Sequence, residues 1–467
     1  MRVAYKECAD AARTAEQLLV ERYRCPEALG EFVAGGTVSA NSGYFRFGSD
    51  TVCFGQCASG VPAKFVTEAL HDARDHVMLD GGTVQLPFDP AQVLDNLRYE
   101  RYGIASPKAK TLPANGFFRG LYYLARPLLG VSVRKHLQRR YFRGWEKIPF
   151  PQWPVDSTVE NLLDELLLLS MQSRNIERIP FIWFWPDGAR SCAMLTHDVE
   201  TQAGRDYCAQ LMDINDSFGI KSSFQIVPEK RYSVPPYYLE RIQRRGFEVN
   251  VHDLNHDGRL MCDREEFLRR AERINHYGRQ FGALGFRSAV MYRNGDWYDA
   301  LDFSYDMSMP NVAHLDPQQG GCCTVMPYFI GKILELPLTT IQDYSLFNIL
   351  GDYSTRLWKE QIALLRSKHG LMSFLIHPDY IIDRAARRIY VELLQCLSAL
   401  RAEQEIWLAL PSEVDTWWRT RNELNLVDAG GSWRIQGKGC ERARLAYACR
   451  VNGKLTYQID PAPHPAD

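Results

Sequence analysis

Short apolar runs alternate with amphipathic helical stretches through the second half of the chain. The apolar runs lie at 193–195, 222–227, 247–251, 284–286, 303–305, 333–336, 371–376 and 406–410. Helical stretches separate several of them, at 207–218, 236–245, 264–281, 355–368 and 384–401. Strands that alternate with helices form parallel βαβ units. So many units in one region predict an α/β fold with a closed or nearly closed barrel.

The regions on either side of this alternating stretch have a different pattern. A helix is expected at 12–23 and short glycine-punctuated strands at 44–48 and 51–55, which is an α+β pattern. A leucine-rich helix is expected at 158–173. We therefore expect an N-terminal α+β region (1–105), a basic and aromatic helical connector (106–189), the barrel (190–424), and a small β-rich appendage with a Pro-rich tail (425–467).

The composition narrows the class of protein. The 467 residues can bury a large core, and the net charge of −1 argues against nucleic acid as a partner. The 12 cysteines are scattered, and neither Cys53 with Cys57 nor Cys322 with Cys323 has a second pair at zinc-ribbon spacing, so reduced thiols are expected. The first residues lack the apolar core of a signal peptide, and no run approaches a membrane span of about 18 apolar residues. We expect a cytoplasmic protein; its oligomeric state stays open.

The segment 101–145 contains no acidic residue. Its basic side chains are interleaved with aromatic residues and leucines: Arg119, Arg126, Arg134, Lys135, Arg139, Arg140 and Arg143. Two interpretations are open. The segment contacts a polyanion or the inner face of a membrane peripherally, or it forms helices packed on the barrel with a solvated basic face.

Charged and imidazole side chains follow directly after several of the apolar runs. In an extended segment, residues two apart point the same way, so Asp198 and Glu200 are expected on one side and Val199 on the other. Chemistry in parallel barrels sits at the carboxyl ends of the strands. The residues expected to converge there are Asp198, Glu200, His252, His256, Arg287 and His377.

Two of these histidines have the spacing of metal ligands. His252-Asp-Leu-Asn-His256 places two imidazoles about one turn apart, although position 253 is Asp and not the Glu of a helical zinc-protease motif. With Glu200 from another strand end, they predict a site for a divalent metal ion. The alternative is that both are structural histidines with satisfied hydrogen bonds.

Hydrolysis needs a base to take a proton from water and an acid to protonate the leaving group. Asp198 is our candidate base and His377 our candidate acid. Arg287 is expected to pair with Asp198 and to keep its pKa low enough for ionisation. The alternative is that Arg287 forms an ordinary ion pair on the barrel rim.

The motifs resemble those of a known family. Thr196-His-Asp198-Val-Glu200, His252-Asp-Leu-Asn-His256, Phe286-Arg287-Ser-Ala and Leu375-Ile-His377 follow in the order and spacing of the polysaccharide deacetylases, the nodulation-factor deacetylase-like carbohydrate esterases (family 4). The resemblance covers about residues 190–424. It implies a distorted (β/α)7 barrel that uses a divalent metal, usually zinc, to remove an acetyl group from a glycan.

The resemblance also implies roles for individual residues. It makes Asp198 the base, His252 and His256 metal ligands, and His377 the acid. The family usually has a second Asp as a metal ligand where this chain has Val199, so Glu200 is our candidate for that ligand.

The substrate side departs from the family as well. The family's Arg-x-Pro-aromatic motif keeps only its arginine, Arg287. Tyr292, Trp297 and Tyr380 are aromatic residues near strand ends that could stack on sugar rings.

Our leading hypothesis is a metal-dependent hydrolase that removes an N- or O-linked acetyl group from a glycan or glycan precursor, with a saccharide as its partner. Two alternatives remain: a hydrolase of carbon–nitrogen bonds in small amides on the same barrel, and a catalytically silent glycan-binding or scaffold protein.

Overall fold

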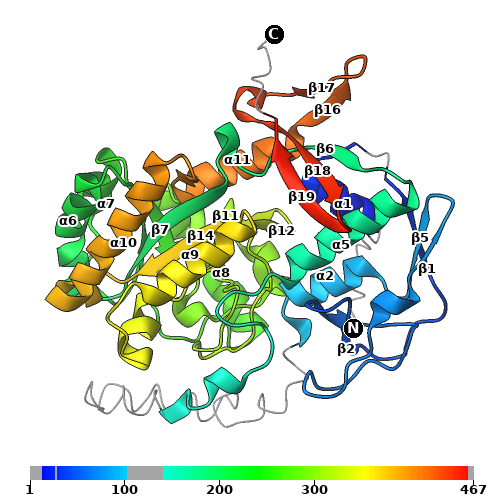
Figure 1. The fold of residues 1–467 in the computed structure, drawn as a ribbon. Coiled ribbons are helices and arrows are strands. Elements are labelled where there is room, and N and C mark those ends of the chain that lie inside the picture. Colours follow the sequence, from blue (N-terminus) through cyan, green and yellow to red (C-terminus); the bar gives the residue numbers. More distant parts are fainter. Residues whose placement is uncertain (1–12, 27–28, 103–139, 461–467) are drawn as a thin grey trace, which may run out of the picture. The chain divides into compact units, whose positions relative to one another are not determined.

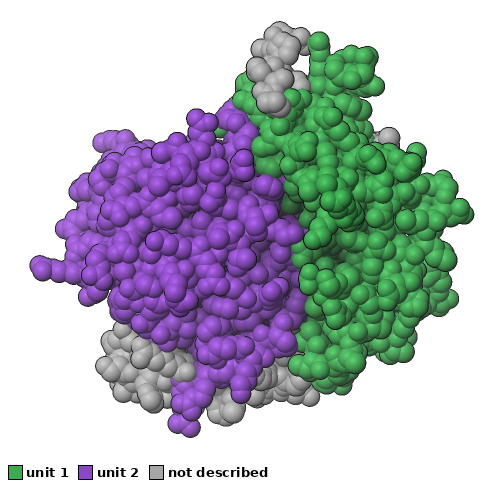
Figure 2. All heavy atoms as spheres, viewed as in Figure 1, with its two compact units in different colours: residues 1–97, 161–183, 422–467 green, residues 98–160, 184–421 purple. Residues whose placement is uncertain are grey.

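The computed structural model describes residues 13–26, 29–102 and 140–460 of the chain. The chain divides into two compact units (Figure 2). Unit 1 comprises Met1–Leu97, Asn161–Trp183 and Asn422–Asp467, and unit 2 comprises Arg98–Glu160 and Phe184–Arg421. Most of the basic segment at 101–145 lies outside the described residues, so its role stays a prediction.

A nine-stranded, mostly parallel sheet forms the centre of unit 2 (Figure 1). Its order is β12-β13-β11-β10-β9-β8-β7-β14, with β15 also paired to β7, and only the β12–β13 pair is antiparallel. The strands are β7 (Ser191–Val199), β8 (Ser223–Ile226), β9 (Glu248–His252), β10 (Gly285–Arg287), β11 (Tyr305–Asp306), β12 (Tyr328–Ile330), β13 (Ile333–Glu335), β14 (Leu371–Ile376) and β15 (Ile406–Leu408). This mixed α/β fold with a curled, barrel-like sheet confirms the predicted fold class.

Amphipathic helices cover this sheet. They are α6 (Gln202–Ser217), α7 (Pro236–Arg244), α8 (Arg264–Phe281), α9 (Arg356–Ser367), α10 (Arg384–Ala402) and α11 (Pro411–Glu423). Polar caps fix where they begin: the side chain of Asp263 accepts a hydrogen bond from the backbone N–H of Glu266 at the start of α8. The helix ends at Gly282, whose φ of +62° suits a residue without a Cβ.

The core of unit 2 lies between the sheet and these helices. One cluster of buried side chains joins Ala193, Phe224, Val249, Phe286 and Phe374 of the strands to Leu211, Ile242, Ile274, Leu365 and Leu394 of the helices. All nine residues of β7 are buried, as expected for a parallel strand covered on both faces.

The chain between β13 and α9 runs beside β14 without forming a regular ladder. The hydroxyl of Thr339 donates to the carbonyl oxygen of Leu371 (2.6 Å), and that of Thr340 donates to the carbonyl oxygen of Ser373 (2.7 Å). The backbone N–H of Ser373 donates to the Thr339 hydroxyl in return (3.0 Å). These side-chain bonds guide the segment toward the carboxyl end of β14, where it delivers Asp343.

Short helices complete unit 2. They are η5 (Trp145–Lys147), η6 (Pro186–Gly188), η7 (Ala289–Met291), η8 (Gly295–Ala300), the π-helix η9 (Ser345–Leu350) and η10 (Tyr380–Ile382). Of these, η10 follows β14 in the chain, and η9 begins two residues after Asp343.

Unit 1 is an α+β assembly. Its elements are α1 (Ala15–Tyr23), β1 (Glu31–Ala34), β2 (Gly43–Arg46), β3 (Val52–Gly55), η1 (Ala73–His76), β4 (Met78–Asp80), β5 (Thr83–Leu86), α2 (Pro90–Arg98), α5 (Thr158–Ser173), β6 (Arg178–Ile182), β16 (Asn425–Asp428), β17 (Trp433–Gln436), η11 (Cys440–Arg442), β18 (Leu445–Val451) and β19 (Lys454–Ile459). The strands form sheets β1-β5-β4 and β19-β18-β6 and two hairpins, β2-β3 and β16-β17. The C-terminal residues thus contribute β16 to β19, and the β18-β19 hairpin is joined to β6 by a backbone ladder.

Among the described residues, no helix combines the length and the apolar character that crossing a lipid bilayer requires.

Candidate metal centre and active site

The carboxyl ends of neighbouring parallel strands bring the candidate residues together. Arg287, the last residue of β10, is in register with His252, the last residue of β9. Ile376, which precedes His377, is in register with His197, which precedes Asp198. Because these strands run in parallel and in register, their last side chains meet at one edge of the sheet.

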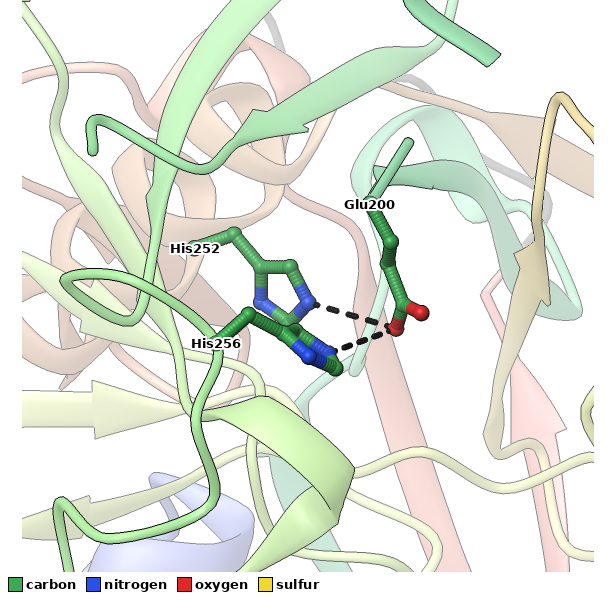
Figure 3. Close-up of side chains that lie close together, drawn as sticks. All are labelled: Glu200, His252 and His256. Carbon is green, nitrogen blue, oxygen red and sulfur yellow. Dashed lines mark ion pairs between the residues drawn. The ribbon is translucent and has the colours of Figure 1, made fainter. Parts of the chain in front are cut away.

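Glu200 lies at the centre of this group. Its Oε1 atom is 2.7 Å from Nε2 of His256, 3.4 Å from Nε2 of His377 and 3.7 Å from Nε2 of His252. Figure 3 shows one ring nitrogen of His252 and one of His256 directed at the Glu200 carboxylate. One ligand atom from each of Glu200, His252 and His256 lies within 4.8 Å of the others, and the same holds for Asp198, Glu200 and His377.

The first of these groups fits a divalent cation. The Nε2 atoms of His252 and His256 are buried and face the Glu200 carboxylate, and neither has a hydrogen-bond partner among the described residues other than the carboxylates of this group. Burial works to raise the pKa of Glu200, but His256 and then His252 and His377 lower it well below its usual value, so the carboxylate is ionised. One carboxylate and two imidazoles make up a ligand set common at catalytic metal sites.

Asp198 is bound by Arg287, the arginine that we expected from the sequence to pair with it. Nη1 of Arg287 donates to Oδ1 of Asp198 (2.8 Å) and to the hydroxyl of Thr196 (2.8 Å). The Arg287 side chain is 0% exposed, so this ion pair is buried and is not an ordinary solvent-exposed one. Burial works to raise the pKa of Asp198, but Arg287, followed by His252 and His377, lowers it below its usual value. The second oxygen, Oδ2, faces Nε2 of His252 at 3.5 Å.

His377 is held by an aspartate that our reading of the sequence did not identify. Oδ1 of Asp343 lies 2.6 Å from Nδ1 of His377, and its Oδ2 accepts the backbone N–H of His377 (2.8 Å). Burial works to lower the pKa of His377, but Asp343, followed by Glu200, raises it well above its usual value. The raised pKa favours the cationic form of the imidazole, with a proton on each ring nitrogen, and its Nε2 faces Glu200.

Solved polysaccharide deacetylases resemble this chain. One from Mycobacterium smegmatis is 17% identical over 54% of this chain and 98% of its own length, with a TM-score of 0.43. The peptidoglycan deacetylase PdaC from Bacillus subtilis is 14% identical over 50% of this chain and 93% of its own, with a TM-score of 0.33. An allantoinase, Puue, is 12% identical over 50% of this chain and 92% of its own length, with a TM-score of 0.38.

No protein-family model and no curated protein matches the sequence.

The three aromatic candidates for substrate binding lie in different surroundings. Tyr380 is beside the site, with its ring 4.9 Å from that of His377 and 5.6 Å from that of Tyr344, which we did not single out in the sequence. Trp297 packs on Phe267 of α8 at 5.5 Å, against the hydrophobic core. Tyr292 is half-buried after η7. The roles of all three in binding substrate stay predictions.

Replacing Glu200 with glutamine tests whether this residue is a metal ligand. Removing its charge is expected to weaken binding of a divalent ion by at least about tenfold. Chelator competition with the purified protein measures this affinity. Asp206→Asn, which removes an exposed carboxylate on α6, is the control. An unchanged affinity in Glu200→Gln would exclude Glu200 from the ligand set.

Proposed function

We propose that the protein is a metal-dependent deacetylase that hydrolyses an N- or O-linked acetyl group on a saccharide. The observation that carries this proposal is the convergence of a candidate base, Asp198, and a candidate acid, His377, on one ligand group. Asp198 approaches His252 at 3.5 Å, and His377 approaches Glu200 at 3.4 Å.

Glu200, His252 and His256 would hold the metal ion, for which we propose Zn²⁺. When bound there, the ion would supply Lewis acidity that polarises the acetyl carbonyl.

Asp198 is arranged to accept a proton. Oδ1 is occupied by Arg287, whereas Oδ2 makes no bond to that arginine and faces the ligand group. The lowered pKa keeps the carboxylate ionised, so Oδ2 can take a proton from the attacking water. The oxygen of that water adds to the acetyl carbon.

His377 is arranged to give a proton. Asp343 holds its Nδ1 and leaves Nε2 facing the ligand group. When the bond between the acetyl carbon and the substrate nitrogen or oxygen breaks, Nε2 protonates the departing amine or hydroxyl, and acetate is the second product. Tyr380 lies next to this acid and Tyr344 lies next to Tyr380, so a sugar ring of the leaving group could stack on them.

Release of acetate tests the proposal. The metal-loaded protein is incubated with N-acetylated and O-acetylated saccharides and, in parallel, with ureides and simple amides. Acetate from the saccharides alone is the expected result. Cleavage confined to the ureides or amides would assign the barrel to a different carbon–nitrogen hydrolase, and metal binding without any turnover would identify a silent binding protein.

Replacing Asp343 with asparagine is expected to lower kcat by about 100-fold with little change in KM. Asparagine offers one acceptor oxygen where aspartate offers two, so it cannot hold both the ring and the backbone N–H of His377. Steady-state kinetics of acetate release measure the effect, and Asp302→Asn, at an exposed position, is the control. A kcat equal to that of the wild type would remove Asp343 from the mechanism.

A further inference from the structure

The two histidines of the candidate metal centre are oriented by partners of opposite character. Nδ1 of His252 lies 3.1 Å from the carbonyl oxygen of Arg287, which can only accept a hydrogen bond. Nδ1 of His256 lies 2.9 Å from Nη2 of Arg231, which can only donate one. The two rings therefore cannot carry their protons on the same nitrogen.

This difference decides which nitrogen is free to bind a metal. A histidine ligand normally donates its other ring N–H to an acceptor, which leaves a lone pair directed at the metal. His252 meets this condition through its Nδ1–H. In His256, by contrast, the Arg231 bond requires a lone pair on Nδ1. The proton of a neutral His256 ring is then on Nε2, the atom that faces Glu200 at 2.7 Å.

Arg231 is anchored to His256 by a second bond. Its Nη2 also donates to the backbone carbonyl oxygen of His256 (2.8 Å). His256 has a φ of +53°, a left-handed conformation that is uncommon for a residue other than glycine. The arginine thus contacts both the ring and the strained backbone of one candidate ligand, and its side chain is half-buried.

We propose that Arg231 is a positioning residue that opposes metal binding. It holds His256 with its proton on Nε2, and the bond from Arg231 to the ring must break before Nε2 can serve as a ligand. The proposal rests on the proposed function only in taking Glu200, His252 and His256 as the ligand set. Most residues that hydrogen-bond to a metal ligand strengthen metal binding, and their replacement weakens it. The effect proposed for Arg231 is the opposite.

Metal affinity of the full-length protein tests the proposal. The protein is stripped with a chelator, and the dissociation constants for Zn²⁺ and Co²⁺ are measured by competition with a chromophoric chelator. Arg231→Gln provides an amide oxygen that can accept the Nδ1–H, so binding about tenfold tighter than in the wild type is expected. Arg231→Lys can still only donate, and an affinity within about twofold of the wild type is expected.

Two further variants separate the position of the proton from simple charge. Arg231→Met removes the cation without adding an acceptor, and its affinity is expected to fall between those of the wild type and Arg231→Gln. Lys230→Gln removes an exposed neighbouring cation and is expected to change nothing. Thermal unfolding of the metal-free proteins checks that each variant is folded. If Arg231→Gln does not fold, the proposal is tested by comparing the other two variants: Arg231→Met is expected to bind the ions more tightly than Lys230→Gln.

The outcomes distinguish this proposal from the proposed function. If Arg231→Gln binds the ions no more tightly than the wild type, or no more tightly than Arg231→Met, the proposed role of Arg231 is wrong. An equal gain in Lys230→Gln would overturn it as well. A wild type that binds neither ion would overturn both proposals. The expected order of affinities without acetate release would overturn the deacetylase alone.

Discussion

Asp198→Asn is expected to lower kcat by about 1,000-fold or more while the divalent ion stays bound. The asparagine oxygen can still accept the hydrogen bond from Nη1 of Arg287, so the surroundings of the side chain are kept. Its amide cannot take a proton from water at Oδ2, which is the function we assign to Asp198. The ligand set of Glu200, His252 and His256 is untouched, so metal affinity is expected to change little.

Acetate release and metal content, measured on the same preparation, check this expectation. Asp213→Asn, which removes an exposed acid on α6, is the matched control and is expected to keep both. Arg287 is buried and loses the charge of its partner in Asp198→Asn, so thermal unfolding is measured alongside. Loss of the metal from a folded Asp198→Asn protein would make Asp198 a ligand and would contradict its role as the base.

His252→Ala is expected to abolish both metal binding and turnover. The imidazole of His252 is one of the two imidazoles in the proposed ligand set, and its Nδ1 bond to the carbonyl oxygen of Arg287 fixes its direction. Removing a ligand is expected to weaken metal binding by more than the roughly 10–100-fold loss seen when a residue that hydrogen-bonds to a ligand is replaced. The variant also removes the group that faces Oδ2 of Asp198.

Metal content after dialysis and the rate of acetate release measure the loss. His276→Ala is the matched control, because this histidine is exposed on α8 and is not among the candidate ligands. The control is expected to keep the ion and the activity. Retention of the ion by His252→Ala at wild-type affinity would contradict the ligand set.

The regular elements of unit 2 could be predicted because their signals are local. The apolar run at 371–376 matches β14 (Leu371–Ile376), and the stretch at 264–281 matches α8 (Arg264–Phe281). A helix bounded by a capping Asp263 and by Gly282 is marked by its own residues, and a buried strand by an uninterrupted apolar run. The convergence of strand ends followed from the same local pattern, because parallel strands place their carboxyl ends at one edge.

The residues that hold the site in place could not be found in this way. Asp343 lies in a segment that runs alongside β14 and is bonded to it by the hydroxyls of Thr339 and Thr340. No apolar run therefore marks the position of Asp343 in the sequence. Arg231 lies in a loop, and nothing in the sequence shows that its guanidinium bonds to His256. In unit 1, the pairing of β6 with β18 joins distant parts of the chain. The hydrophobic pattern of a strand does not show which other strand it pairs with.

Aromatic residues show the same limit. Trp297 and Tyr380 were equal candidates for contacts with sugar, since a sequence shows an aromatic ring but not what it packs on. The structure places Tyr380 beside His377 and Trp297 on Phe267 of α8. Tertiary packing, rather than residue type, separates a ring at the site from a ring in the core.

We propose that Asp198 and His377 act on a substrate held at the metal group formed by Glu200, His252 and His256. The decisive measurement of this claim is acetate released from an N-acetylated saccharide by the wild-type protein, before chelation, after chelation and after Zn²⁺ is restored. The expected result is release that stops with the chelator and returns with the ion. Release that persists in the chelated protein, or none after the ion is shown to be bound, would contradict the claim.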